Sequence, residues 1–210
     1  MIALVDYDMG NLHSVQKAVA KVGYESFRVN EPENLEQADL LILPGVGAFR
    51  DAITSLQSRG LDQAIRSHIQ KGKPFLGICL GLQLLFEKSE ESGGVDGLGI
   101  LPGVVKKFSK SPGLKIPHMG WNQVHCQENA PEFAKRMDAR YFYFVHSYYV
   151  EPYETDIIAG VSSYPEAFCV AVSKDNIFAV QFHPEKSQKN GLELLGFYLK
   201  SHLSQKSSSK

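Results

Sequence analysis

The chain has 210 residues, a length that one hydrophobic core can serve and that leaves little room for a second domain. Hydrophobic residues make up 43% of it and charged residues 21%, which excludes the composition typical of disordered proteins. The 22 basic residues nearly balance 23 acidic ones, so the overall charge does not attract nucleic acid or an anionic membrane surface.

The sequence shows neither a membrane-spanning run nor a secretion signal. No apolar run approaches the roughly 20 residues that span a bilayer, and residues 1–11 do not resemble a secretory leader. The three cysteines, Cys79, Cys126 and Cys169, are odd in number and lack paired spacing, which is typical of a reducing compartment. We therefore expect a cytoplasmic protein with at least one free thiol.

Apolar strands and amphipathic helices alternate in the first half of the chain. The expected elements are a strand at 1–6, a helix from the capping Asn11 to Gly23, a strand at 38–43, helical spacing at 53–72, a strand at 74–78 and a helix at 80–88. Continuous apolar strands that alternate with helices are typical of a parallel sheet covered on both faces. This half predicts an α/β fold.

The second half is richer in strands. After a loop at 89–99 we expect strands at 104–108 and 121–124, a short helix at 131–137, more strands from Tyr141 onward, and a last amphipathic helix through 192–199. Strands at 168–173 and 177–182 flank the turn-favouring residues 174–176, which predicts an antiparallel hairpin. The sequence therefore predicts a mixed, mostly parallel central sheet with helices on both faces. We expect one domain at 1–203 and a polar, disordered tail at 204–210.

Cys79 lies in Gly77-Ile78-Cys79-Leu80-Gly81, where the strand at 74–78 meets a helix. A nucleophile flanked by small residues at this junction forms a sharp elbow that lifts the side chain clear of the sheet. The N-terminus of the following helix would favour the nucleophilic thiolate. A lone cysteine is more often a buried structural residue, but the two flanking glycines favour the nucleophile.

A thiol nucleophile needs a base, and His183 is the best placed of the seven histidines because it follows an apolar strand. Pro184 biases His183 toward extended geometry, and residues two apart in an extended chain point the same way. Glu185 can therefore lie beside the imidazole and orient it. The alternative is a surface His-Pro turn with a solvated glutamate.

Acyl transfer also needs hydrogen-bond donors for an oxyanion. Gly45-Val46-Gly47 follows a strand and can present bare backbone N–H groups, with the Leu80 N–H as a second donor; the alternative is a tight turn without function. The stretch lacks the third glycine and the following acidic residue of a dinucleotide-binding fingerprint. No cluster with metal-ligand spacing occurs either, so we expect no cofactor and no metal.

Three motifs in this order, PGVG at 44–47, GICLGLQ at 77–83 and QFHPEKS at 181–187, resemble the triad-type (class I) glutamine amidotransferases over nearly the whole chain. Within that family, DYDMGNL at 6–12, PHMGWN at 117–122 and HSYY at 146–149 resemble the glutaminase subunits of imidazole glycerol phosphate synthase. His13 departs from the arginine expected after GNL.

The resemblance implies a flavodoxin-like fold and a reaction. Cys79 would attack the side-chain amide of glutamine, His183 would pass the proton to the departing ammonia, and Glu185 would orient His183. It also assigns substrate contacts to Gln83, Gly47 and the backbone around Ser147 and Tyr148. We expect Val46 or Gly47 to reorient and complete the oxyanion hole when a partner binds.

The resemblance implies a heterodimer with a (β/α)8-barrel cyclase subunit, which uses the ammonia to make imidazole glycerol phosphate and aminoimidazole carboxamide ribonucleotide (AICAR). Ammonia released into water would largely protonate, so we expect a closed passage to the partner. Candidates for the partner interface and ammonia passage are Asn11, Trp121, Tyr141 and Lys186. A core position is the alternative for Trp121, and sheet packing is the alternative for most of the tyrosines.

Three other functions remain open at this point. The same glutaminase half-reaction could supply a sugar amidotransferase in surface polysaccharide synthesis, an alternative suggested by His13 and the serine- and lysine-rich tail. A Cys-His peptidase-like α/β protein is the second, and a catalytically inactive binding module is the third. The intact set of Cys79, His183 and Glu185 argues against the third.

Overall fold

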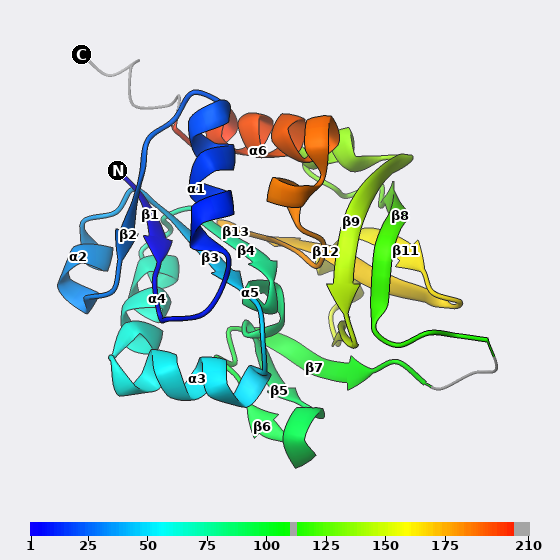
Figure 1. Ribbon diagram of the computed structural model, residues 1–210. Helices are drawn as coiled ribbons and strands as arrows, with labels where there is room; N and C mark the ends of the chain where they lie inside the picture. The colour runs from blue at the N-terminus through cyan, green and yellow to red at the C-terminus, as the bar shows by residue number, and fades with distance from the viewer. Residues whose placement is uncertain (110–112, 204–210) are drawn as a thin grey trace.

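The computed structural model of the chain describes residues 1–109 and 113–203 (Figure 1). The predicted tail at 204–210 lies outside the described residues, so the division of the chain at residue 203 stays a prediction. Within the described part, no helix combines the length and the apolar character needed to cross a bilayer.

Five parallel strands form the core of the sheet, in the order β2-β1-β3-β4-β13. They are β1 (Ile2–Val5), β2 (Ser26–Val29), β3 (Leu40–Gly45), β4 (Phe75–Cys79) and β13 (Ile177–Val180). Every residue of β1, β3, β4 and β13 is buried, as expected for strands that carry helices on both faces.

Helices cover the two faces of this parallel core (Figure 1). On one face lie α1 (Leu12–Lys21) and α6 (Gln188–Leu203); on the other lie α3 (Phe49–Ser58) and α4 (Leu61–Gln70), with α2 (Pro32–Glu36) beside α4. Side chains of β1 alternate between the two faces: Ala3 and Val5 pack in the α3/α4 core, and Ile2 and Leu4 pack in the α1/α6 core. The predicted layered α/β architecture is confirmed.

Antiparallel strands extend the core beyond β13 and make the sheet mixed, as predicted. The path continues through β12 (Ala167–Lys174), β10 (Tyr148–Pro152), β7 (Leu101–Lys107), β5 (Phe86–Ser89) and β6 (Val95–Asp96), with β5 and β7 parallel. The predicted hairpin joins β12 to β13, with Lys174 paired to Ile177 and Asp175 at a positive φ of 52° in the turn.

Three further strands fold over to one side of this path and form a smaller antiparallel layer (Figure 1). They are β11 (Ile158–Ser163), β8 (His118–Cys126) and β9 (Arg140–His146); β11 pairs with β12 and β8, and β8 pairs with β9. Short 3-10 helices complete the described chain: η1 (Glu91–Gly93), η2 (Ala134–Met137), η3 (Thr155–Ile157) and η4 (Pro184–Lys186).

The structure corrects several element predictions. The helix expected at 80–88 is wrong: α5 is a single turn (Leu80–Gln83), and the chain then forms β5. Residues 80–86 are all buried, and such a run has no polar face to distinguish a helix from a strand. The helical stretch at 53–72 divides into α3 and α4 at Gly60, whose φ is 68°. Neither β2 nor α2 was predicted.

Candidate active site

Cys79 stands at the elbow between β4 and α5, with a positive φ of 55° that a residue with a side chain rarely adopts. The flanking glycines make this turn possible. A Cβ atom on Gly81 would lie 1.9 Å from the Leu43 carbonyl oxygen, and one on Gly77 would lie 2.9 Å from the Gly81 carbonyl oxygen. Because no side chain fits at either position, the motif is required for the elbow itself.

His183 and Glu185 follow β13 and are both buried, each with a side chain 2% exposed. The imidazole Nδ1 lies 2.8 Å from Glu185 Oε1. The backbone of His183 is anchored at both ends, because its N–H donates to the Tyr143 carbonyl (2.9 Å) and its carbonyl accepts from Ser187 Oγ (2.7 Å). The carboxylate thus occupies Nδ1 and leaves Nε2 for exchange of a proton with Cys79.

The charges at this site favour a protonated His183. Burial opposes the imidazolium, but the Cys79 thiolate and the Glu185 carboxylate outweigh it and raise the pKa of His183 to about 10. An imidazolium beside a cysteine sulfur favours the nucleophilic thiolate form. The helix that follows Cys79 is only one turn long, so the nearby positive charge would come from His183 and not from the N-terminus of a long helix.

A hydrogen-bonded pair of glutamines lies against Cys79. Gln181 Nε2 donates to Cys79 Sγ over 3.7 Å, and Gln181 Oε1 accepts from Gln83 Nε2 at 3.0 Å. Gln83 Nε2 also donates to the Tyr148 carbonyl at 3.0 Å. Gln181 was missed, although the two-residue spacing that joins His183 to Glu185 extends back to it and would have found it.

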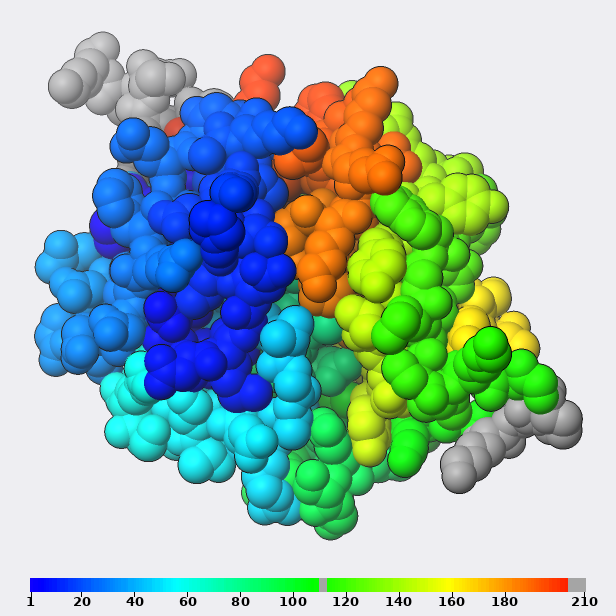
Figure 2. Space-filling view, in the orientation of Figure 1, coloured from blue at the N-terminus to red at the C-terminus, as the bar shows by residue number. Residues whose placement is uncertain are grey.

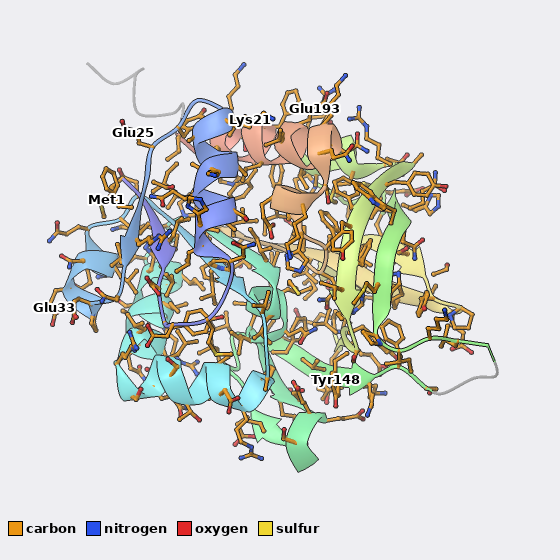
Figure 3. All side chains as sticks on the ribbon, viewed as in Figure 1. Met1, Lys21, Glu25, Glu33, Tyr148 and Glu193 are labelled. Atoms are coloured by element: carbon orange, nitrogen blue, oxygen red, sulfur yellow. The ribbon has the colours of Figure 1, made fainter. Side chains whose placement is uncertain are left out.

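A pocket of about 290 Å³ opens in front of Cys79. It is lined by Val46, Gly47, Cys79, Leu80, Gln83, Glu91, Pro117, Val145, His146, Ser147 and Tyr148. The structure therefore brings the predicted oxyanion and substrate residues together around one cavity, with Gly45 beside Cys79 in the sheet behind it. Tyr148 lies beside the end of β7 (Figure 3), where it pairs with Lys107.

Glu91 supplies the one carboxylate among the residues that line the pocket. Its Oε2 accepts a hydrogen bond from the Phe49 N–H at the start of α3, at 3.0 Å, which holds the carboxylate in place. Glu91 falls in the loop predicted at 89–99, and no local pattern distinguishes it, because its position in the pocket depends on the pairing of distant elements.

The predicted oxyanion segment lies at the carboxyl end of β3. The Tyr7 hydroxyl donates to the Pro44 carbonyl at 3.0 Å and supports this strand end from below. Gly47 has a φ of 101°, which glycine adopts freely, and Val46 is 38% exposed. The segment is thus anchored at Pro44, and at Gly47 it adopts a backbone conformation that favours glycine.

The four residues predicted at the partner interface are all exposed. Trp121 is 47% exposed and Tyr141 53% exposed, so the core position considered for Trp121 is wrong. Asn11 also caps α1, since its Oδ1 accepts from the Ser14 N–H at 3.3 Å. Figure 2 shows α1, the segment that leads into α6, β9 and β8 side by side on one face of the molecule.

No group of three or more His, Cys, Asp or Glu side chains placed to hold a metal ion occurs among residues 1–109 and 113–203. The described site consists of a cysteine, a histidine and a carboxylate next to a cavity with backbone donors. This set can form and hydrolyse a covalent acyl-thioester.

Two solved structures share this fold. A crystal structure of a glutamine amidotransferase superposes with a TM-score of 0.75 and 16% identity, covering 96% of this chain and 98% of the other. The structure of PurLQS from Thermotoga maritima matches with a TM-score of 0.73 and 18% identity, covering 97% of each chain.

Sequence relatives are much more similar. The imidazole glycerol phosphate synthase subunit HisH of Syntrophotalea carbinolica is 50% identical over 200 residues, covering 93% of this chain and 97% of the relative. The subunit of the same name from Acinetobacter baylyi is 50% identical over 195 residues, covering 92% and 95%. The model of the family described as glutamine amidotransferase class-I matches residues 3–197. The chain therefore belongs to the class-I glutamine amidotransferases and, among them, to the family of HisH subunits.

Proposed function

We propose that this chain is a glutaminase that hydrolyses glutamine to glutamate and ammonia. The ammonia passes to a cyclase subunit that makes imidazole glycerol phosphate and AICAR in histidine biosynthesis. The observation that carries the proposal is Cys79 at a strained elbow, facing a pocket of about 290 Å³ and backed by the buried His183–Glu185 pair. The names of the HisH relatives supply the pathway.

Acylation begins with a thiolate–imidazolium pair. The Cys79 sulfur attacks the side-chain amide carbon of glutamine, and the carbonyl π electrons move to oxygen, which forms a tetrahedral oxyanion. As the oxyanion collapses, the C–N bond breaks and His183 transfers its Nε2 proton to the leaving nitrogen, which departs as ammonia. The result is a γ-glutamyl thioester on Cys79 and a neutral His183.

Deacylation uses the same residues in reverse. Neutral His183 removes a proton from water as the water oxygen attacks the thioester carbon, and the C–S bond then breaks to release glutamate. The thiolate and the imidazolium are restored. Glu185 holds the Nδ1 side of the ring through both steps, so that Nε2 always faces the reacting atoms.

The oxyanion needs two donors at the carbonyl oxygen. The Leu80 N–H lies directly after the nucleophile, and the second donor comes from the Val46–Gly47 segment. Gly47 gives that segment its freedom to turn. We therefore propose that this segment controls glutaminase activity. Partner binding turns it into the donor position, so the isolated chain hydrolyses glutamine only slowly.

The pocket offers complementary groups for both ends of an amino acid. The Glu91 carboxylate would pair with the α-ammonium group of glutamine, because it is the acidic side chain in the lining. Gln83 and the backbone of Ser147–Tyr148 would contact the rest of the substrate. A substrate without the α-ammonium group would leave the Glu91 carboxylate without its counter-charge.

The partner would cover the face formed by α1, η4, β8 and β9. Met119, Trp121 and Tyr141 expose apolar and aromatic surface there, at 61%, 47% and 53%, and such side chains are enriched among interface anchors. Asn11 and Lys186 add polar groups from α1 and η4. This face borders the strand ends that carry Cys79 and His183, which suits a short path for ammonia into the partner.

The central experiment measures glutamate release from glutamine, with and without a cyclase subunit and its ribonucleotide substrate, for the wild-type chain and Cys79→Ala. The wild-type chain should require the liganded partner for full turnover. Cys79→Ala should lose glutamine-dependent turnover, while synthesis driven by added ammonium salt persists in the complex. Glutamine turnover that survives in Cys79→Ala would rule out this nucleophile.

A growth experiment tests whether the chain acts in histidine biosynthesis. Expression of the chain in a strain that lacks the glutaminase subunit should restore growth without histidine. A folded chain that binds the cyclase and still fails to restore growth would favour the polysaccharide-linked alternative. Membership of the amidotransferase family disfavours the peptidase alternative.

A further inference from the structure

Two buried histidines lie end to end beside the pocket. His118, the first residue of β8, and His146, the last residue of β9, are 3% and 6% exposed. His118 Nδ1 lies 2.9 Å from His146 Nε2. At the outer ends of the pair, His118 Nε2 lies 3.2 Å from Asn122 Nδ2, and His146 Nδ1 lies 2.7 Å from the Tyr148 carbonyl oxygen. All four ring nitrogens therefore have partners.

The direction of this chain follows from the Asn122 end. Asn122 Nδ2 also donates to the Ser163 carbonyl at 2.9 Å, and Asn122 Oδ1 accepts from the Gln123 N–H at 2.8 Å. A flipped amide would lose both of these bonds, so the group facing His118 is a donor. His118 Nε2 must then accept, which leaves its proton on Nδ1.

The opposite end requires the same arrangement. The Tyr148 carbonyl can only accept, so His146 carries its proton on Nδ1 and accepts from His118 through Nε2. Both ends therefore specify two neutral rings with their protons on Nδ1. A second proton on either ring would set two donors against each other.

The surroundings favour neutral rings as well. Phe144, Tyr164 and Phe168 pack around His118 with ring centroids 5.0, 4.1 and 5.8 Å away. Burial lowers the pKa of His118 to about 4, and it lowers the pKa of His146 to about 3 although the Tyr148 carbonyl favours protonation. The pair is therefore not suited to proton transfer at neutral pH.

The chain ends on the backbone of the glutamine pocket. The Tyr148 carbonyl accepts from both His146 and Gln83, and Gln83 continues through Gln181 to the Cys79 sulfur. At the other end, Asn122 follows Trp121 on β8, the strand that exposes Trp121 on the proposed partner face. A continuous set of directional hydrogen bonds thus connects that strand to the pocket and the nucleophile.

We infer that His118 and His146 are positioning residues whose relayed hydrogen bonds, running from Asn122, hold the Tyr148 carbonyl and with it Gln83 and the Ser147–Tyr148 edge of the pocket in the arrangement that binds glutamine. The inference rests on the proposed glutaminase function. It predicts that what matters at residue 146 is a donor at the Nδ1 position, and not the size or basicity of an imidazole.

Two substitutions separate these possibilities. In His146→Asn the side-chain amide can replace the Nδ1 donor, whereas in His146→Gln the amide reaches the Nε2 position and leaves the Tyr148 carbonyl without its donor. In the complex with the cyclase subunit, His146→Gln should raise the KM for glutamine roughly tenfold with a smaller change in kcat, as expected for one lost buried hydrogen bond. His146→Asn should stay within about threefold of wild type, a difference smaller than the cost of one such bond.

A matched control separates positioning from plain stability. His68 is equally buried, at 2%, and its Nε2 bonds to the Pro74 carbonyl at 3.0 Å on the opposite face of the sheet. His68→Asn should lower the unfolding temperature and leave the KM for glutamine unchanged. If His146→Gln behaved like His68→Asn, or if both substitutions at 146 raised KM equally, the positioning role would be wrong. At His118 the Asn variant should likewise keep a KM for glutamine closer to wild type than the Gln variant, which provides a second comparison if a variant at 146 does not fold.

The tautomers can be measured without any turnover. Long-range proton–nitrogen NMR correlations of the imidazole-labelled full chain at neutral pH should show His118 and His146 neutral, each with its proton on Nδ1. A proton on Nε2 of either ring, or a doubly protonated ring, would overturn the inference. A chain with these tautomers that hydrolysed no glutamine in the complex would instead contradict the proposed function.

Discussion

At Cys79, the proposed nucleophile, local backbone geometry and local charge act on the same side chain. The positive φ is held by glycines that no other residue could replace, since their absent Cβ atoms would overlap the Leu43 and Gly81 carbonyls. The pKa of His183 is raised, and this shift depends on the Cys79 sulfur and on Glu185. The backbone conformation of Cys79 thus depends on its flanking glycines, and the protonation state of His183 depends on Cys79 and Glu185.

The raised pKa of His183 predicts a pH dependence of stability. Because the folded pKa is about 10 against an ordinary value of 6.5, the stabilisation is fully present at and below about pH 6.5 and is lost as the pH rises toward 10. The free energy of urea unfolding of wild type minus that of His183→Gln should therefore decrease across this range. In Cys79→Ala the decrease should be complete at a lower pH, because the thiolate is the first contribution that raises this pKa. A difference that grew with pH would contradict the assigned charge state.

At the scale of elements, the segment from β13 through η4 into α6 positions His183, the proposed base. Its close packing depends on Gly191, where a Cβ atom would lie 1.9 Å from the Pro184 carbonyl oxygen. The Gly191 N–H also donates to the Ser187 carbonyl at 3.1 Å. The start of α6 thus fixes the short helix that carries Glu185.

Two glycines of α6 provide a matched pair of substitutions. Gly191→Ala should displace η4 and lower both stability and kcat for glutamine, because the clash is with backbone atoms next to His183 and Glu185. Gly196→Ala would place its Cβ 3.6 Å from Val22, an ordinary contact, and should stabilise the chain by roughly 0.5–1 kcal/mol through helix propensity. Thermal unfolding and glutamate release measure both effects. Equal behaviour of the two variants would show that η4 is not held by this contact.

At the scale of the whole molecule, the active site lies where the parallel core meets the antiparallel strands. The core supplies Cys79 from β4 and His183 from the segment after β13, while β9, β10 and η1 with Glu91 supply the opposite wall of the pocket. The proposed partner face combines both parts (Figure 2). A partner bound there would contact each side of the pocket at once.

Two exposed tyrosines test the location of that face. Tyr141 on β9 is 53% exposed within it, and Tyr153, just beyond β10, is 61% exposed outside it. Tyr141→Ala should raise the Kd for the cyclase subunit by roughly tenfold, as is usual for an aromatic interface anchor, while Tyr153→Ala should leave it unchanged. Titration calorimetry checks both, and equal Kd values for the two variants would place the interface elsewhere.

The sequence predicted the elements whose signals are local. The capped helix after Asn11, the buried strands β1, β3 and β4, and the β12–β13 hairpin all follow from caps, apolar runs and turn residues. The prediction for 80–88 failed for the complementary reason. Its buried apolar residues fit a helix or a strand, and pairing with β7 and β6 makes β5 a strand.

The site residues, like the elements, divide into those that the sequence predicts and those that only the structure reveals. The sequence by itself pointed to Cys79, His183 and Glu185 as the proposed nucleophile, base and orienting carboxylate, because the elbow and the His-Pro-Glu spacing are short patterns with direct geometric consequences. Only the tertiary structure decided which side chains complete the site. Gln181 reaches Cys79 across 102 positions, Glu91 bonds to Phe49 across 42, and His118 meets His146 across 28. Such contacts depend on strand order and burial, which arise when distant segments pack together and which no short stretch of sequence encodes.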